Sequence, residues 1–379
     1  MRVGIDARFF GPRAKGIGRY NQKLLEELEK LDSQNDYVVF LRRENFDEFL
    51  PQKNNFKKVL ADFRWYSWGE QLIFPFLIYR QKVDLMHFTH FNLPIFYFRP
   101  YVLTLHDLIL QRFGTARGRL LGRLHYGFKN LAYKIIIKLA ARRAQKIIAV
   151  SSYVKNDIVK MLDVSAKKIA VIYEGAPILD DGEEQIANSK EILNKYKIKK
   201  PYLLYVGNAY PHKNLPRLIE AFKILKEKSQ PNLQLALVGG EDYFYRQLKK
   251  KHCDNSGVCL SGGVIFTGFV SDNELKTLYE ESSAYVFPSL CEGFGLPPLE
   301  AMARKTAVAA SSETCLPEIL GQAAHYFDAK SPVDIAAKIN EVLFNEELRQ
   351  KLVEKGLGQI KKYSWQKMAG EVLSVYQNQ

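Results

Sequence analysis

Apolar residues along the chain fall into two alternating patterns. Short runs of β-branched and aromatic residues alternate with longer stretches in which apolar residues recur at helical spacing. In the first half this pattern predicts helices at 18–31, 67–80 and 120–144. It predicts strands at 2–6, 37–41, 84–88, 101–105, 146–150 and 169–173. Strands that alternate with helices are typical of a parallel α/β sheet.

The same alternation restarts near residue 200. Strands are predicted at 202–206, 233–238, 264–267, 284–287, 307–309 and 324–327. Helices are predicted at 215–228, 273–281, 296–303 and 332–343, and the last stretch, 347–379, is helical in pattern. The expected fold is therefore α/β, with two Rossmann-like doubly wound domains. Ligands of such sheets bind at the carboxyl ends of the strands, so we expect the site in a cleft across which the domains face each other.

A change of composition separates the two halves. Acidic residues at 180, 181, 183 and 184 are followed by a polar stretch and by the basic run that ends at Pro201. This order is typical of an interdomain linker. We expect a first domain at 1–178, a linker at 179–200 and a second domain at 201–355. The helix at 356–379 is expected either to cap the second domain or to cross back to the first.

Length and composition agree with two soluble domains. The chain has 379 residues, of which 47% are hydrophobic and 25% charged, so both cores can be filled. The first residues form a strand-like run that stops at Asp6, unlike a signal peptide. The four cysteines lack the spacing of a zinc site. We expect a cytoplasmic protein without a metal.

The net charge of +14 calls for an anionic partner. Basic residues cluster with aromatic and aliphatic residues between Arg112 and Lys146, and Trp68, Phe74 and Phe76 extend the apolar part. Such a stretch can rest on an anionic membrane, at the inner face of the plasma membrane, or it can be a core-facing helix with a solvated basic side. Nucleic acid is not expected, because none of the common recognition motifs is present.

The segment 286–303 has the most informative pattern. A buried strand ends at Pro288, a loop with two glycines follows, and a helix opens near Leu296. Backbone N–H groups of such a loop and first helical turn attract anions, and a sugar diphosphate is a good candidate. Glu292 and Glu300 frame the loop and could accept hydrogen bonds from sugar hydroxyls. Each glutamate alone could equally be a solvated surface charge.

This Glu-x7-Glu segment resembles the signature of the retaining glycosyltransferases of family 4, which have the GT-B fold, and in particular bacterial mannosyltransferase-type members. The resemblance implies that Glu292 lies against the donor sugar hydroxyls and that Glu300 binds the nucleotide ribose. It also implies that the intervening backbone serves the sugar and diphosphate, at Gly293, Phe294, Gly295 and Leu296.

Further motifs extend the resemblance over the chain. The stretch 205–215 is similar to the family's basic strand–loop, where Lys213 matches the lysine that neutralises the diphosphate. Asn208 stands where many members have an arginine, and we expect His212 to replace part of that missing charge. Alternatively, Lys213 is a surface lysine that leads a helix.

Three other loops match family positions. Gly16 and Gly18 belong to a glycine loop that, by resemblance, reaches over the diphosphate. His106 matches a histidine near the donor sugar, although a structural histidine at a strand end is the alternative. The loop after 264–267 is expected to meet the nucleobase edge, through Phe269 and Val270, while Ser271 and Glu274 form a capping box. His87 and His90 are interpreted as loop or acceptor-side residues.

The resulting hypothesis is a retaining, metal-independent hexosyltransferase that needs no cofactor. Its donor is a nucleoside diphosphate sugar and its acceptor a glycan or a lipid-linked saccharide. Resemblance favours GDP-mannose, while UDP-sugars stay open. His106, Lys213 and Glu292 are the expected catalytic residues. Two alternatives stay open as well: a sugar-nucleotide epimerase or hydrolase of the same fold, and a non-catalytic membrane or nucleic-acid adaptor.

Overall fold

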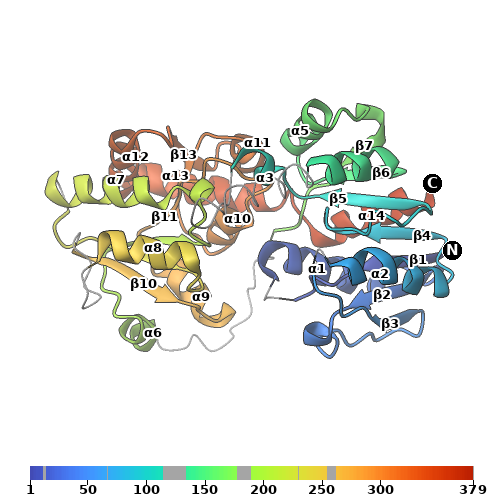
Figure 1. Cartoon of the computed structure of the whole chain (residues 1–379). Coiled ribbons are helices and arrows are strands. Elements are labelled where there is room, and N and C mark those ends of the chain that lie inside the picture. Colours follow the sequence, from blue (N-terminus) through green and yellow to red (C-terminus); the bar gives the residue numbers. More distant parts are fainter. Residues whose placement is uncertain are drawn as a thin grey trace. The chain divides into compact units, whose positions relative to one another are not determined.

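A computed structural model of the chain, which describes residues 1–11, 14–65, 67–113, 134–176, 189–228, 230–253 and 262–378, divides into two compact units (Figure 1). The first unit comprises Met1–Gly175 and Tyr363–Gln379, and the second comprises Ala176–Lys362. The expected linker at 179–200 lies partly outside the described residues. Its described remainder contains helix α6 (Ser189–Lys195), which packs against α9 (Asp272–Glu280) in the second unit.

The first unit contains a seven-stranded parallel sheet in the order β3-β2-β1-β4-β5-β6-β7. Its central strands are buried and largely apolar, as expected for strands that are covered on both faces, whereas the edge strands β3 and β7 are only partly buried. They are β1 (Arg2–Asp6), β2 (Asp36–Leu41), β3 (Phe56–Leu60), β4 (Leu85–Phe88), β5 (Tyr101–Leu105), β6 (Lys146–Ala149) and β7 (Ile169–Val171).

Helices of the first unit come from both ends of the chain. They are α1 (Lys15–Leu31), α2 (Trp68–Arg80), α3 (Ile109–Arg112), a helix over 134–143, α5 (Ser152–Leu162) and α14 (Trp365–Gln377). The C-terminal helix α14 packs against α1, so the end of the chain completes the core of the first unit (Figure 1). Most of the helix expected at 120–144 lies outside the described residues.

The second unit contains a six-stranded parallel sheet in the order β10-β9-β8-β11-β12-β13. Its strands are β8 (Tyr202–Val206), β9 (Gln234–Val238), β10 (Val264–Gly268), β11 (Ala284–Phe287), β12 (Val308–Ser311) and β13 (Ala324–Phe327). Its other helices are α7 (Leu215–Lys228), α8 (Tyr243–His252), α10 (Leu296–Ala303), α11 (Leu316–Leu320), α12 (Pro332–Phe344) and α13 (Glu346–Ile360).

Strand order reverses once in each sheet. In the first sheet the reversal lies between β1 and β4, and in the second it lies between β8 and β11. Loops that leave the carboxyl ends of two such strands go to opposite faces and leave a crevice between them, which is where open α/β sheets bind ligands. The fold therefore directs attention to the loops after β1, β4, β8 and β11.

Candidate functional site

The loops after β8 and β11 are tied together at the reversal point of the second sheet. β8 and β11 are neighbours, with Leu204 opposite Tyr285. The backbone N–H of Leu290 donates to the carbonyl of His212 at 2.7 Å, which joins the two loops directly. Two segments whose residues Lys213 and Glu292 are 79 positions apart in sequence thus form one surface at the carboxyl edge of the sheet.

Lys213 and Glu292 form an ion pair on this surface. The Nζ of Lys213 lies 2.6 Å from Oε1 of Glu292, and the two side chains are only 15% and 10% exposed. Lys213 ends a short 3-10 turn at Pro211–Lys213, and Asn214 follows in the left-handed conformation with φ of 62°. The Asn214 amide donates to the carbonyls of Pro288 at 3.1 Å and Ala329 at 2.7 Å. These bonds fix the backbone that carries Lys213.

The loop from Glu292 to Gly295 is buried and held by hydrogen bonds to Thr314 and Cys315. The N–H of Glu292 donates to Oγ1 of Thr314 at 3.1 Å, and the Cys315 thiol lies 3.3 Å from the carbonyl of Phe294. Gly295 has φ of +100°, and a Cβ there would lie 3.0 Å from a methyl group of Leu316. This position therefore requires glycine for both its backbone conformation and its packing.

Helix α10 begins at Leu296 without a side-chain cap, and residues 297 and 298 are prolines. Proline has no backbone N–H, so among the first three residues of the helix only Leu296 has an amide that can donate. An anion at this helix start would depend on loop amides more than on the helix itself. Expected contacts at Gly293, Phe294, Gly295 and Leu296 stay predictions.

Glu300 lies further along α10 and is half-buried. The hydroxyl of Tyr279, at the end of α9, is 3.2 Å from Oε2 of Glu300 and donates toward it. Glu292 and Glu300 are thus both oriented by polar partners, and Glu292 is buried whereas Glu300 is half-buried. Neither is a freely solvated surface charge.

The structure changes the expectation for His212. Burial, together with the neighbouring charge of Lys213, lowers the pKa of His212 to about 4. The ring is therefore uncharged at neutral pH, and His212 does not replace the positive charge missing at Asn208. The carbonyl of Asn208 accepts a hydrogen bond from Tyr205 at 2.7 Å, and its side chain accepts one from the N–H of Tyr210 at 3.3 Å. Lys213 carries the charge of the 207–214 loop.

The loop after β10 has one exposed and one buried residue. Gly268 has φ of +75°, and after it Phe269 is 79% exposed whereas Val270 is buried. Glu274 reaches back to the N–H of Ser271 at 3.4 Å and to its hydroxyl at 2.7 Å, so the predicted capping box of α9 is confirmed. The expected nucleobase contacts of Phe269 and Val270 stay predictions.

In the first unit, His106 follows β5 and has an acceptor at each ring nitrogen. Nε2 donates to the carbonyl of Thr89 at 3.0 Å, and Nδ1 lies 2.9 Å from Oε1 of Glu174. Both ring nitrogens therefore have a polar partner, and the two contacts fix the orientation of the His106 ring. The edge-to-face ring of Tyr20, at 4.8 Å, packs against it. Sequence reasoning missed Glu174, although its position three residues after β7 is a signal.

His87 is a core residue, so its interpretation as a loop or acceptor-side residue is wrong. Its Nδ1 lies 2.6 Å from the hydroxyl of Tyr376 on α14, and its Nε2 lies 2.7 Å from the hydroxyl of Thr104 on β5. Burial lowers the pKa of His87 to about 3, which keeps it neutral. His90 is half-buried and packs against the rings of Phe9 and Phe91.

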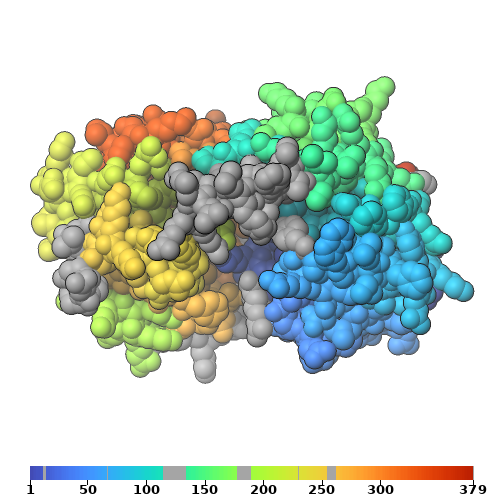
Figure 2. All heavy atoms as spheres, in the orientation of Figure 1, coloured from blue at the N-terminus to red at the C-terminus, as the bar shows by residue number. Residues whose placement is uncertain are grey.

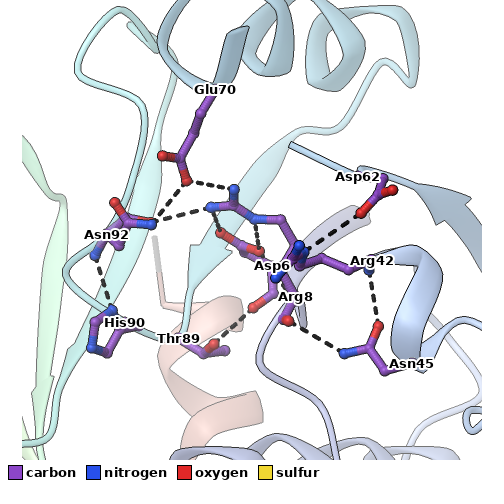
Figure 3. A network of polar contacts seen from close by, with 9 residues as sticks. All are labelled: Asp6, Arg8, Arg42, Asn45, Asp62, Glu70, Thr89, His90 and Asn92. Atoms are coloured by element: carbon purple, nitrogen blue, oxygen red, sulfur yellow. Dashed lines mark hydrogen bonds and ion pairs between the residues drawn. The ribbon is translucent and has the colours of Figure 1, made fainter. Parts of the chain in front are cut away.

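A buried charge network fills the reversal point of the first sheet (Figure 3). The guanidinium of Arg8 makes two bonds to Asp6, at 2.7 and 2.8 Å, and one to Glu70 at 2.6 Å. Asn92, after β4, donates to the same Glu70 oxygen at 2.9 Å and accepts from Arg8 through its carbonyl at 3.2 Å. Burial alone would lower the pKa of Arg8, but the two carboxylates raise it above its usual value. The network joins the loops after β1 and β4 to α2.

Gly16 and Gly18 both lie in the first turn of α1. A Cβ at Gly18 would sit 1.9 Å from the carbonyl oxygen of Gly11, so the helix can start here only with glycine. Gly16 is exposed, and a Cβ there would meet nothing within 4 Å. Gly18 thus has a structural role, whereas Gly16 leaves the backbone open to a ligand.

The described residues contain neither a candidate metal centre nor a helix that could span a membrane. None of these residues form a group of three or more His, Cys, Asp or Glu side chains that could hold a metal ion. Within the same ranges, every helix is too short or too polar to cross a membrane.

Comparison with known protein families finds matches over both halves of the chain. Residues 14–178 match the family described as Glycosyltransferase Family 4, and residues 188–359 match Glycosyl transferases group 1.

Three curated relatives cover most of the chain. O-antigen chain mannosyltransferase B of Escherichia coli is 28% identical over 384 residues, which is 95% of each protein. O-antigen chain mannosyltransferase RfbU of Salmonella typhimurium is 30% identical over 69% of this chain and 65% of its own length. The uncharacterized glycosyltransferase MJ1178 of Methanocaldococcus jannaschii is 31% identical over 73% of this chain and 68% of its own length.

Solved structures confirm the fold. Sucrose-phosphate synthase from Thermosynechococcus elongatus matches 100% of this chain and 98% of its own, with a TM-score of 0.76 and 18% identity. WaaG, a glycosyltransferase involved in lipopolysaccharide biosynthesis, matches 99% of both chains with a TM-score of 0.70 and 15% identity. The two Rossmann-like units predicted from the sequence therefore belong to the GT-B fold.

Proposed function

Because the chain belongs to glycosyltransferase family 4 and has mannosyltransferase relatives, we propose that it transfers mannose from GDP-mannose to a hydroxyl of a glycan or lipid-linked saccharide, with retention at the anomeric carbon. That the chain is a glycosyltransferase follows from the family. The donor, the acceptor and the stereochemistry are the proposal.

The contact between Lys213 and Glu292 is the observation that carries this proposal. The two residues come from loops after β8 and β11 and meet at 2.6 Å at the reversal point of the sheet. A cation next to a carboxylate suits a ligand with a phosphate on one side and sugar hydroxyls on the other. In the free protein the two charges neutralise each other, and a bound diphosphate would take over as the partner of Lys213.

The reaction breaks the bond between the anomeric carbon and the β-phosphate oxygen and forms a bond from that carbon to the acceptor oxygen on the same face. The acceptor proton passes to the departing phosphate oxygen, so the products are a glycoside and a nucleoside diphosphate. Lys213 and the amides of the 293–296 loop would stabilise the charge that develops on the phosphate, which is the largest contribution in such sites. No metal or cofactor takes part in this scheme.

The other residues orient the donor. Glu292 would accept hydrogen bonds from sugar hydroxyls and Glu300 from the ribose, since carboxylates are acceptors that can bridge vicinal hydroxyls. His106 would lie beside the donor sugar, as the family resemblance implies. Glu174 would be a positioning residue that fixes the ring of His106 by the 2.9 Å bond to Nδ1.

Support for mannose comes from two relatives, which are 28% and 30% identical mannosyltransferases by name. The same two are described as O-antigen chain enzymes, which favours a saccharide acceptor that is carried on a lipid. UDP-sugars are the alternative donors.

A donor screen tests the proposal. The purified protein is incubated with GDP-mannose, UDP-glucose and ADP-glucose against a set of lipid-linked saccharides, and products are read by mass spectrometry. We expect addition of one hexose from GDP-mannose only when acceptor is present. In Glu292→Gln, kcat/KM should fall about 10²–10³-fold, because the variant loses one fixed charge at the reacting centre.

Glu341→Gln is the matched control, since Glu341 pairs with His325 on the surface of the same unit. It should keep full activity. Transfer by Glu292→Gln at the wild-type rate would remove Glu292 from the mechanism. Epimerised or free sugar formed without acceptor would instead support the epimerase or hydrolase alternative.

A further inference from the structure

Helix α2 is apolar on the side that faces solvent as well as on the side that faces the core. Trp68, Leu72 and Phe76 are spaced one turn apart and are 77%, 56% and 68% exposed, and Ile73 beside them is 59% exposed. On the opposite side Phe74, Pro75 and Ile78 are buried. A surface helix normally has polar residues outward, so the outward side of α2 is not explained by folding alone.

The apolar surface continues onto the neighbouring segment. Phe96 and Phe98, in the loop between β4 and β5, are also exposed. The loop is joined to α2 by two hydrogen bonds, from the N–H of Ile95 to Gln71 at 2.9 Å and from the N–H of Phe98 to the Tyr79 hydroxyl at 2.9 Å. We refer to this surface as the exposed apolar face, formed by Trp68, Leu72, Ile73, Phe76, Phe96 and Phe98.

Single exposed apolar residues are ordinary in soluble proteins. A contiguous group of them instead marks a site where a protein, a membrane or a ligand binds. α2 lies at the surface of the first unit, and its blue spheres are open to view in Figure 2. Burying large side chains such as Trp68 and Phe76 would recover the free energy that their exposure costs.

Basic residues lie on and next to the segments that form this face. Arg143, from the helix over 134–143, lies 4.5 Å over the ring of Phe98 and donates to the carbonyl of Ile95 at 2.6 Å. Arg99 lies over the ring of Tyr79 at 5.3 Å. Arg80 and Lys82, at the end of α2, are exposed. The acid of α2, Glu70, is fully buried in the Arg8 network and does not offset these charges.

We propose that the exposed apolar face inserts into the interface of an anionic lipid membrane, with the adjacent arginines and Lys82 against the lipid head groups. Tryptophan and phenylalanine favour the boundary between head groups and acyl chains, and basic side chains next to them are attracted by anionic lipids. These basic residues make a lipid surface a better match than a second copy of this chain, because two copies would bring the same positive charges together.

This surface differs from the one expected from the sequence. Phe74 was expected to take part and is buried, while Leu72, Ile73, Phe96 and Phe98 were not expected. Much of the basic stretch at 112–146 lies outside the described residues. The proposal concerns the first unit only and does not rest on the donor site, so each can fail without the other.

Flotation with vesicles tests the proposal on the full chain. Vesicles of phosphatidylglycerol and phosphatidylcholine in equal parts are compared with phosphatidylcholine alone, at low salt and at 1 M salt. We expect the wild type to float with the anionic vesicles at low salt and much less at 1 M, where charges are screened within about 3 Å. The double variant Leu72→Ser/Phe76→Ser should lose at least about tenfold in partitioning.

Val333→Ser/Phe344→Ser is the matched control, because Val333 and Phe344 are 63% and 59% exposed on α12 of the second unit. It should float like the wild type, and all variants should keep their thermal stabilisation by GDP. A wild type that stays at the bottom of the gradient at low salt would overturn the proposal. So would equal flotation of both double variants, or a dimer seen by light scattering that Leu72→Ser/Phe76→Ser breaks.

Discussion

At the scale of single residues, two side chains of this protein are held by carboxylates from distant parts of the chain. Lys213 pairs with Glu292, and His106 contacts Glu174 through Nδ1. In both cases the side chains are shielded from water, so these polar contacts are stronger than they would be at the surface. A carboxylate that orients a cation before the ligand arrives reduces the cost of organising the site when it binds.

Replacing Glu174 by glutamine tests its positioning role. Glu174→Gln keeps an oxygen near His106 but replaces the carboxylate at Nδ1 with an uncharged, weaker hydrogen-bonding partner, so we expect kcat/KM to fall about tenfold. The pH dependence of kcat/KM should also change shape, which a purely structural role would not cause. Asp163→Asn, which removes an exposed partner of Arg142 in the same unit, should leave rate and pH profile as in the wild type. An unchanged profile for Glu174→Gln would contradict the role.

Sequence reasoning could name residues that belong to motifs, but it missed contacts that depend on folding. His106, Lys213, Glu292 and Glu300 were named because their motifs resemble those of the family, and their roles stay predictions. Glu174 lies 68 residues from His106, and no local pattern connects them. The uncharged state of His212 also depends on burial, which its neighbours in sequence do not reveal.

At the scale of elements, the predicted pattern found the central strands but missed β3, α5 and α8, as well as the short helices α3 and α11. β3 is an edge strand with two lysines, Lys57 and Lys58, and only its first residue is buried. Lysines protect an edge from pairing with other chains but remove the apolar signal that identifies a strand. α8 consists largely of aromatic and basic residues, and its start is fixed by the Asp242 side chain, which accepts from the N–H groups of Phe244 and Tyr245.

The Arg8 network makes a prediction about the stability of the first unit. Arg8→Met would leave the carboxylates of Asp6 and Glu70 buried without their cation, so we expect a loss of about 3–5 kcal/mol in the free energy of unfolding. Urea unfolding at neutral pH measures this difference. Arg43→Met is the control: its side chain is 81% exposed in its ion pair with Asp62, and the expected loss is below about 1 kcal/mol. Similar losses for both variants would contradict the account of the network.

At the scale of the whole molecule, both sheets place their polar residues where strand order reverses. The first sheet has the Arg8 network between β1 and β4, and the second has Lys213 and Glu292 between β8 and β11. The alternation of strands and helices was enough to predict two such sheets, because the period of apolar residues depends on local geometry alone. Strand order was not predictable in this way, since it depends on which strands pair.

The chain passes between the units twice, after Gly175 and after Lys362. Within the first unit, the residues before the first crossing contact the residues after the second. A Cβ at Gly175 would lie 2.4 Å from Trp365, and the ring centroids of Tyr173 and Tyr363 are 5.7 Å apart. The return of the chain is further fixed by the bond between Tyr376 and the buried His87. These contacts join residues that are far apart in the sequence, so they could not be predicted from local patterns. Only the helical pattern of the last 33 residues could be predicted from the sequence.

The central claim is that the carboxyl edge of the second sheet holds a nucleoside diphosphate sugar. A crystal structure of the protein with bound GDP-mannose tests it most directly. The account predicts the diphosphate on Lys213 and the 293–296 amides, the sugar hydroxyls on Glu292 and the ribose on Glu300. A nucleotide bound elsewhere, with neither glutamate in contact with it, would contradict the claim.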